Sequence, residues 1–302
     1  MNWEAFAGRL ETLCPGMEVR RQEPMAEHTT FRVGGPAALL CLPANEREVR
    51  LLLRAAGEAG VTPFFLGNGS NLLVADEGVD RLLVKLSGEF TQVRQEREEL
   101  VGGGGVLLSR LSSAAQELGL TGLEFASGIP GTVGGALTMN AGAYGGEMAQ
   151  VVSWVKVIDL TGKIDVLPVE DCQLSYRHSG FEDGKRLILE AGFRLKEGER
   201  ETIRAAMADL AQRRREKQPL EYPSAGSTFK RPPGHFAAAL IDQCGLKGCT
   251  VGGAQVSEKH TGFIINRGNA TCGDVLALTE KVKRRVLDQT GVPLELEIRV
   301  LR

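Results

Sequence analysis

The residues best suited to binding an anion are concentrated in a glycine-rich stretch near the middle of the chain. The segment "GIPGTVGGALTMNAGAYGGE", residues 128–147, holds seven of the chain's 38 glycines within twenty residues. Glycine loses more freedom on ordering than any other residue, so such a run destabilises a fold unless something compensates. Tight turns would compensate, and so would a ligand against the bare backbone, but the run is longer than a turn requires. We therefore expect a ligand, and its predicted contacts are Gly128, Gly131, Thr132, Gly134 and Asn140.

A second loop of this kind follows an apolar segment earlier in the chain. In "LGNGSNLLV", residues 66–74, the predicted contacts are Gly67, Asn68, Gly69, Ser70 and Asn71. Successive N–H groups in such a loop form an anion-binding nest, and Asn and Ser side chains add donors; a plain turn is the alternative. Neither loop contains GxxxxGK[ST], GxGxxG or GxSxG. Two nest loops indicate one ligand with two phosphates, a dinucleotide bound without the Rossmann fingerprint.

The elements that position these loops alternate between strands and helices. "TTFRVGGPAALLCLP" predicts two strands around a Gly-Gly-Pro turn, and "NEREVRLLLRAAGEAG" predicts a helix over 45–60 with Asn45 as its N-cap. The loop at 66–74 then follows a short strand, as binding loops do in α/β units. The other predicted elements are β-rich stretches at 79–110 and 151–168, a hairpin at 161–163, a charged helix at 199–217, a helix at 272–289 and a final strand, "LELEIRVL".

The composition of the chain excludes several classes of protein. It has 302 residues, a net charge of −2 and 42% hydrophobic residues, which gives no broad electrostatic reason to bind nucleic acid or a membrane. We find no apolar run near the ~20 residues that span a bilayer and no apolar block of a signal peptide, so we expect a cytoplasmic protein. Six scattered cysteines and four histidines without HExxH predict neither disulfides nor a metal site.

Six motifs occur in order along the chain: "TTFRVGGPA", "LGNGSNLL", "GIPGTVGGALTMNAGAYGGE", "YRHSGF", "AGSTFKRP" and "LELEIRVL". Taken together, they resemble the UDP-N-acetylenolpyruvoylglucosamine reductase family. This resemblance implies noncovalent FAD, NADPH as reductant and UDP-N-acetylglucosamine enolpyruvate as substrate, reduced to UDP-N-acetylmuramate for peptidoglycan. It also implies an α+β fold with an FAD-binding domain of the vanillyl-alcohol oxidase type at 1–198, in subdomains of about 1–78 and 79–198. A substrate domain follows at 199–302, without the capping insertion of longer members.

The same resemblance assigns the chemistry to three side chains. It makes Ser227 the proton donor to substrate carbon C2, and Glu297 and Arg177 the groups that stabilise the enediolate. From the residues alone, Ser227 is more often a turn cap and Glu297 part of a solvated strand face, and Arg177 fits a charged surface loop. Arg299, two residues beyond Glu297 on the same strand face, is expected to bind the substrate carboxylate.

Contacts to the nucleotide sugar are expected from basic residues near the Ser227 loop. The predicted substrate-binding residues are Arg299, Tyr144, Lys217, Lys230, Lys259 and His260. Two other functions stay open: an oxidase of the same flavin fold, and a nucleotide-sugar-binding protein without catalytic activity. Many such oxidases tether FAD through histidine or cysteine, and "LGNGSNLL" contains neither.

Overall fold

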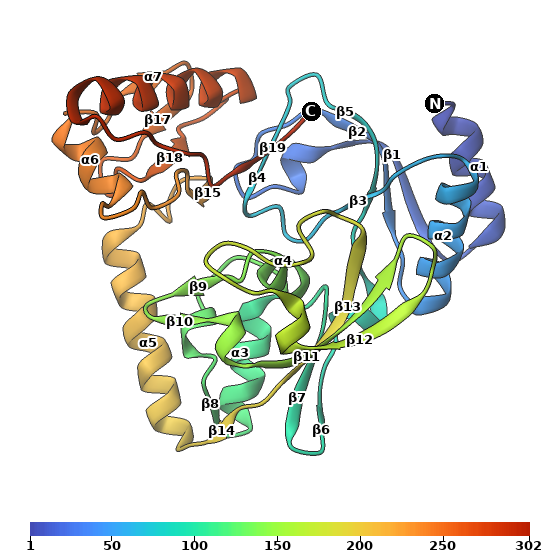
Figure 1. Cartoon of the computed structure of the whole chain (residues 1–302). Coiled ribbons are helices and arrows are strands. Elements are labelled where there is room, and N and C mark those ends of the chain that lie inside the picture. The colour runs from blue at the N-terminus through green and yellow to red at the C-terminus, as the bar shows by residue number, and fades with distance from the viewer. The chain divides into compact units, whose positions relative to one another are not determined.

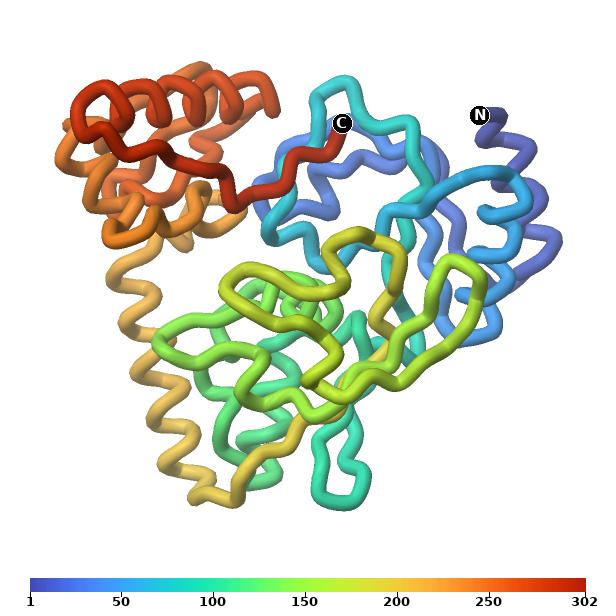
Figure 2. Tube along the Cα trace, in the orientation of Figure 1, coloured from blue at the N-terminus to red at the C-terminus, as the bar shows by residue number.

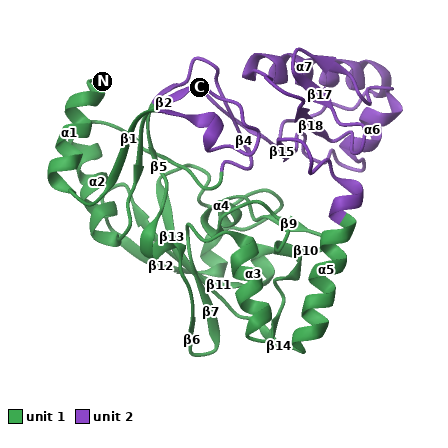
Figure 3. Cartoon of the chain, turned by 180° about the vertical axis from the view of Figure 1, so that it is seen from behind, with its two compact units in different colours: residues 1–22, 38–68, 81–213 green, residues 23–37, 69–80, 214–302 purple.

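The computed structural model describes all 302 residues and divides them into two units (Figures 1 and 3). Each unit is made of three chain segments, and the path through them is followed most easily on the Cα trace (Figure 2). Helices and strands are mixed in both units, which confirms the predicted α+β class. Unit 1 comprises Met1–Gln22, Ala38–Asn68 and Arg81–Arg213, and unit 2 comprises Glu23–Ala37, Gly69–Asp80 and Arg214–Arg302.

The first sheet contains, in spatial order, β1 (Glu18–Pro24), β2 (Pro36–Leu42), β5 (Val79–Val84) and β3 (Phe64–Phe65). Strand β3 runs parallel to β5, and the segment between them carries the loop at 66–74. Helices α1 (Trp3–Leu13) and α2 (Glu46–Glu58) share a buried core with this sheet. That core includes Leu10, Leu39, Leu52 and Leu82.

Helix α2 was predicted from the sequence together with its N-terminal cap. The side chain of Asn45 accepts a hydrogen bond from the Glu48 N–H at 3.0 Å, which satisfies one of the free donors of the first turn. The predicted N-cap is therefore confirmed. The helix ends at Glu58, two residues before the expected position.

A second sheet in unit 1 is antiparallel, and the glycine-rich segment lies partly in a helix that packs against it. Its order is β12 (Ile164–Pro168), β11 (Val152–Asp159), β13 (Arg186–Phe193), β7 (Glu99–Gly103) and β6 (Val93–Glu96). The predicted hairpin at 161–163 joins β11 to β12, and Gly162 takes the left-handed φ of 88° that the turn requires. Helices α3 (Leu108–Glu117) and α4 (Val133–Thr138) contribute to one core with this sheet.

The remaining elements of unit 1 are two small ribbons and most of one long helix. Strand β8 (Leu120–Thr121) pairs with β14 (Lys196–Glu197), and β9 (Gly142–Ala143) pairs with β10 (Gly146–Glu147). Helix α5 (Arg200–Lys217) confirms the charged helix expected at 199–217. The boundary between the units lies within α5, after Arg213.

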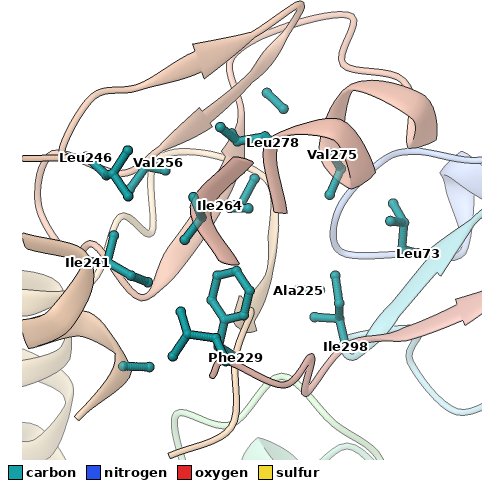
Figure 4. Packing of buried hydrophobic residues seen from close by; sticks show 14 of the residues in the cluster. Leu73, Ala225, Phe229, Ile241, Leu246, Val256, Ile264, Val275, Leu278 and Ile298 are labelled. Atoms are coloured by element: carbon teal, nitrogen blue, oxygen red, sulfur yellow. The ribbon is translucent and has the colours of Figure 1, made fainter. Parts of the chain in front are cut away.

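Unit 2 is built on an antiparallel sheet with two helices packed against its core. The strands are, in order, β15 (Ser224–Ser227), β18 (Phe263–Asn266), β17 (Ala254–Val256) and β16 (Thr250–Val251). The helices are α6 (Ala237–Gln243) and α7 (Cys272–Thr290). Figure 4 shows how Phe229, Ile264, Val275 and Leu278 pack together in this core.

Two segments from the N-terminal part of the chain belong to unit 2, which differs from the domain boundaries drawn from the sequence. Strand β4 (Leu72–Val74) pairs in parallel with β19 (Arg299–Leu301), the last strand of the chain. Phe31 is buried in the core of unit 2. Leu73 and Ile298 belong to the same core (Figure 4). The Asp76 carboxylate also accepts hydrogen bonds from the first N–H groups of α7, at 2.7 and 3.0 Å. Long-range pairing of this kind has no local sequence signal.

The strand predicted in "TTFRV" is wrong, because local hydrogen bonds close this segment into a turn. The hydroxyl of Thr29 donates to the Val33 carbonyl at 3.1 Å, and the Arg32 N–H donates to the Thr29 carbonyl at 3.1 Å. Arg32 has a φ of 54°, a left-handed conformation outside the range of a regular strand.

Candidate functional site

The two loops predicted to bind one ligand touch each other in unit 1. The side-chain amide of Asn68 donates to the Pro130 carbonyl at 2.8 Å, which joins the end of the first loop to the second. Gly67 faces Thr132 so closely that a Cβ on Gly67 would lie 2.8 Å from the Thr132 hydroxyl oxygen. Only glycine allows this approach without displacing one of the loops. The two loops are therefore neighbours, as a single shared ligand requires.

Several backbone N–H groups of these loops are available to an anion. The Val133 and Gly134 N–H groups are bound to the carbonyls of Val106 and Gly104 at 2.8 and 2.9 Å. In contrast, five N–H groups find no acceptor in the protein: those of Gly67, Asn68, Gly128, Gly131 and Thr132. Buried backbone donors are normally paired, and Gly131 and Thr132 are buried residues. This cradle of unpaired donors fits the pyrophosphate of a dinucleotide such as FAD.

Two side chains of the glycine-rich segment are used by the protein itself. The Thr132 hydroxyl accepts from the Gly135 N–H at 3.3 Å and caps α4. The amide of Asn140 donates to the Ser175 carbonyl and accepts from the Ala149 N–H, both at 3.0 Å, and the residue is only 1% exposed. These contacts account for the Asn140 side chain without a ligand, so we remove it from the predicted cofactor contacts.

The second half of the first loop, residues 69–71, belongs to unit 2. Gly69 has a φ of 61°, and a Cβ there would overlap the His28 carbonyl oxygen. The N–H groups of Gly69, Ser70 and Asn71 have no acceptor in the protein and stay predicted cofactor contacts. The Asn71 side chain has another task, because its amide donates to the Glu297 carbonyl at 3.1 Å.

Ser227 is the last residue of β15 and follows a bulge in that strand. The pairing of β15 with β18 changes register between Ser224 and Ser227, and Gly226 inside the bulge has a φ of 75°. A bulge re-aims the side chain that follows it, and such irregularities are common beside active sites. Ser227 is partly exposed, and its hydroxyl makes no hydrogen bond within the protein. An accessible hydroxyl of this kind is suited to act on a substrate.

Glu297 lies on the chain segment next to Ser227 in unit 2. The Glu297 N–H donates to the Thr228 carbonyl at 2.9 Å, and Leu296 pairs with Phe229. The predicted strand over 294–301 is therefore divided: Leu296 and Glu297 lie beside the Ser227 segment, whereas residues 299–301 form β19 against β4. This change of partner places Glu297 beside the segment that carries Ser227.

Thr228 is a residue of this site that the sequence analysis missed. It is completely buried, and its hydroxyl oxygen accepts a hydrogen bond from the Ile264 N–H at 3.0 Å. Its own N–H donates to the Gly262 carbonyl at 2.8 Å. Thr228 thereby holds together the two neighbouring backbone segments that carry Ser227 and Glu297. No sequence signal distinguishes it from any other threonine, because its partners lie more than thirty residues away.

Arg177 lies in a tight turn of unit 1. Ser175 and His178 exchange backbone hydrogen bonds at 3.0 and 3.1 Å, and Arg177 between them has a left-handed φ of 55°. Its guanidinium carbon lies 5.5 Å from the centre of the Tyr176 ring. The His178 ring approaches the Glu182 carboxylate at 3.4 Å.

Tyr144 occupies the tip of the β9–β10 ribbon in unit 1. It has a left-handed φ of 53°, is followed by Gly145 with a φ of 90°, and is 45% exposed. The two left-handed residues match the turn that favours two-residue hairpins. The exposed ring stays a predicted contact for the substrate.

The basic residues expected at the nucleotide sugar have diverse surroundings in unit 2. Lys230 and Lys259 form surface ion pairs with Glu295 and Glu221 at 3.6 and 3.7 Å. Exposed pairs of this kind contribute little free energy, so a phosphate can replace the carboxylate. Burial lowers the pKa of His260, which favours the neutral ring and makes it a hydrogen-bonding group rather than a cation. Lys217, at the end of α5, is exposed.

Two further features bear on the classes of function. The chain brings no three His, Cys, Asp or Glu side chains together in a group that could hold a metal ion. None of its helices combines the length and the apolar character needed to cross a membrane.

Comparison with protein families identifies both parts of the chain. Residues 37–167 match the model of an FAD binding domain. Residues 218–301 match the C-terminal domain of UDP-N-acetylenolpyruvoylglucosamine reductase. The first match contains both glycine-rich loops, and the second contains Ser227, Glu297 and Arg299.

Individual relatives agree with these matches over nearly the whole chain. A UDP-N-acetylenolpyruvoylglucosamine reductase of Clostridium botulinum is 46% identical over 99% of this chain and 97% of its own length. The reductase of Heliobacterium modesticaldum is 46% identical over 93% of this chain and 90% of its own length. The crystal structure of the Thermus caldophilus reductase superimposes with a TM-score of 0.82 at 39% identity, covering 95% of this chain and all of that one. This chain belongs to the UDP-N-acetylenolpyruvoylglucosamine reductase family.

Proposed function

We propose that this protein catalyses the NADPH-dependent reduction of UDP-N-acetylglucosamine enolpyruvate to UDP-N-acetylmuramate, a peptidoglycan precursor, with FAD as its cofactor. One observation carries the proposal beyond family membership. The accessible hydroxyl of Ser227 lies on the chain segment next to Glu297, so a proton donor and a carboxyl group are neighbours in unit 2. Reduction of a carbon–carbon double bond requires such a donor, whereas oxidation of an alcohol does not.

The cofactor is held by the two loops of unit 1. The unpaired N–H groups of Gly67, Asn68, Gly128 and Gly131 are the donors we assign to its pyrophosphate, together with those of Gly69 and Ser70, which continue the first loop. When bound there, FAD would supply the hydride chemistry of the reaction, with NADPH as the source of the hydride and the vinyl carbon C3 of the substrate as its acceptor. Because neither loop contains histidine or cysteine, the association is noncovalent.

Ser227 then supplies the proton that completes the reduction. Addition of hydride at C3 leaves negative charge on C2 and on the adjacent carboxylate, which together form an enediolate. Serine is a very weak acid, but this carbanion is a strong base, so the transfer from Ser227 Oγ to C2 is downhill. Small neighbours, Ala225 and Gly226, leave the hydroxyl accessible.

Three ionisable side chains act on the developing anion. We assign Arg177 and Arg299 to the carboxylate oxygens, because a guanidinium offers a fork of donors that matches them. We assign Glu297 to the same carboxylate, with which its carboxyl group can share a proton. The Asn71 amide and the Thr228 carbonyl position the Glu297 backbone for this contact.

The remaining predicted contacts hold the nucleotide sugar. Lys217, Lys230 and Lys259 are assigned to the diphosphate, with His260 as a neutral hydrogen-bonding partner and Tyr144 as an aromatic contact. We place the reaction in the cytoplasm, where NADPH and UDP-linked sugars are found.

An anaerobic two-step titration tests the proposal. The purified flavoprotein is first reduced with NADPH, and the enolpyruvyl substrate is then added without oxygen. We expect reoxidation of one flavin per substrate consumed and formation of UDP-N-acetylmuramate. A flavin that stays reduced with substrate but is reduced by simple alcohols or sugars would instead identify an oxidase. Tight binding of UDP-sugars without any flavin turnover would identify a binding protein.

A further inference from the structure

The turn that carries Arg177 is fastened to the glycine-rich segment at two points within unit 1. The Asn140 amide donates to the Ser175 carbonyl at 3.0 Å, just before Arg177. The Ser179 hydroxyl donates to the Thr138 carbonyl at 2.8 Å, just after it. Both side chains are only 1% exposed. The two contacts bracket Arg177 at positions two residues away on either side.

Both fastening side chains are themselves fixed by a second hydrogen bond. The Asn140 oxygen accepts from the Ala149 N–H at 3.0 Å, and the Ser179 oxygen accepts from the Phe181 N–H at 3.1 Å. Asn140 also has a left-handed φ of 40°, a conformation that asparagine tolerates better than most residues. A buried polar side chain with both its donor and its acceptor satisfied has one orientation, so each contact holds the turn rigidly.

We propose that Asn140 and Ser179 are positioning residues that fix the Arg177 guanidinium for the reduction of the enolpyruvyl group. The proposal rests on the role assigned to Arg177 above. The Ser175–His178 pair closes the turn around Arg177 but does not attach it to the rest of unit 1. Asn140 and Ser179 make that attachment, to the segment that also contains the cofactor loop. A displacement of about 1 Å at a positioned group can lower a rate by about 10²-fold.

Asn140→Gly tests this directly, because glycine retains the left-handed backbone and removes only the side chain. The flavin-loaded protein is reduced by NADPH in one stopped-flow experiment and reoxidised by UDP-N-acetylglucosamine enolpyruvate in another. We expect reoxidation to slow at least about tenfold and reduction to stay within about twofold of the wild-type rate. Asn269→Gly is the matched control, since Asn269 is exposed with a φ of 55°, and both of its rates should equal the wild-type rates.

A double substitution separates positioning from general structural damage. If Asn140 acts through Arg177, Asn140→Gly should lose its effect on reoxidation in an Arg177→Met background. An undiminished effect there, or equal slowing of both half-reactions, would overturn the proposal. If Asn140→Gly does not fold, Ser179→Ala replaces it in the same experiment. It should slow reoxidation in the wild-type background and not in the Arg177→Met background.

The outcome for Arg177 itself distinguishes this proposal from the function on which it rests. If Arg177→Met slows reoxidation while Asn140→Gly and Ser179→Ala do not, only the positioning role is refuted. If Arg177→Met leaves reoxidation unchanged, the role of Arg177 is refuted and the positioning role with it. If the wild-type protein is not reoxidised by the substrate at all, the proposed function is wrong.

Discussion

Replacement of Thr228 by valine should loosen the strand that underlies Ser227. Valine matches threonine in shape but removes the oxygen that accepts the Ile264 N–H at 3.0 Å. Both residues are at most 1% exposed, so water cannot replace the lost acceptor. A buried donor left without a partner costs about 1–3 kcal/mol. At about 1.4 kcal/mol for each factor of ten, we expect amide exchange in β18 to become about 5- to 150-fold faster.

Thr279→Val provides the matched control, because Thr279 is equally buried in the same core unit. Its hydroxyl donates to the Leu276 carbonyl one turn earlier in α7, so removing the hydroxyl leaves no buried N–H group without an acceptor. We expect this substitution to change stability by less than about 1 kcal/mol. Hydrogen-exchange mass spectrometry on the FAD-loaded protein, following the peptide that contains residues 263–266, compares the two variants. Exchange in Thr228→Val no faster than in Thr279→Val would refute the reasoning.

Two further predictions concern the cofactor loops and the capping of α7. Gly67→Ala should raise the dissociation constant of FAD at least about tenfold, because the new Cβ would lie 2.8 Å from the Thr132 hydroxyl oxygen. Gly57→Ala is the control, since Gly57 has open space around it and its substitution should leave FAD binding unchanged. Equal flavin titration curves for the two variants would contradict this prediction. Asp274→Ala should destabilise the protein by about 0.5–2 kcal/mol at pH 7, because the carboxylate caps α7 and accepts from the Thr271 N–H. Hydrogen bonds from the Thr271 and Gly253 N–H groups hold the pKa of Asp274 below its ordinary 3.8. The extra stability of the wild type over Asp274→Ala is therefore complete above pH 3.8 and is lost as the pH falls below that value. Melting temperatures at pH 7 and pH 3 measure it, and a difference that grows in acid would contradict the assignment.

Local interactions explain which parts of the fold were predictable. Asn45 caps α2 through a residue three positions away, and Gly162 closes a hairpin between adjacent strands, so both are encoded within a few residues. The division of the chain into two units is not local. It depends on the parallel pairing of β4 with β19, whose residues are separated by more than 220 positions along the chain.

The same distinction applies to the candidate site. Both glycine loops were predicted because glycine composition is visible in the sequence. Ser227, Glu297 and Arg177 were proposed because of the motifs around them. The task of the Asn140 amide was not predictable, because its acceptor, the Ser175 carbonyl, is a backbone atom 35 residues away. An asparagine in a glycine-rich segment has the same sequence signature whether it binds a ligand or holds a turn.

The central claim, that Ser227 protonates the substrate, is tested most directly by single-turnover reoxidation of the reduced flavin in Ser227→Ala and Ser227→Cys. Both variants must be folded and saturated with FAD, so that a loss of stability does not enter the rate. A positioned acid contributes about 10²–10⁴-fold, and we expect Ser227→Ala to lose at least that much with flavin reduction by NADPH unchanged. Ser227→Cys should recover part of the loss, since a thiol also donates a proton. Reoxidation of Ser227→Ala within a few-fold of the wild-type rate would show that another group or water supplies the proton.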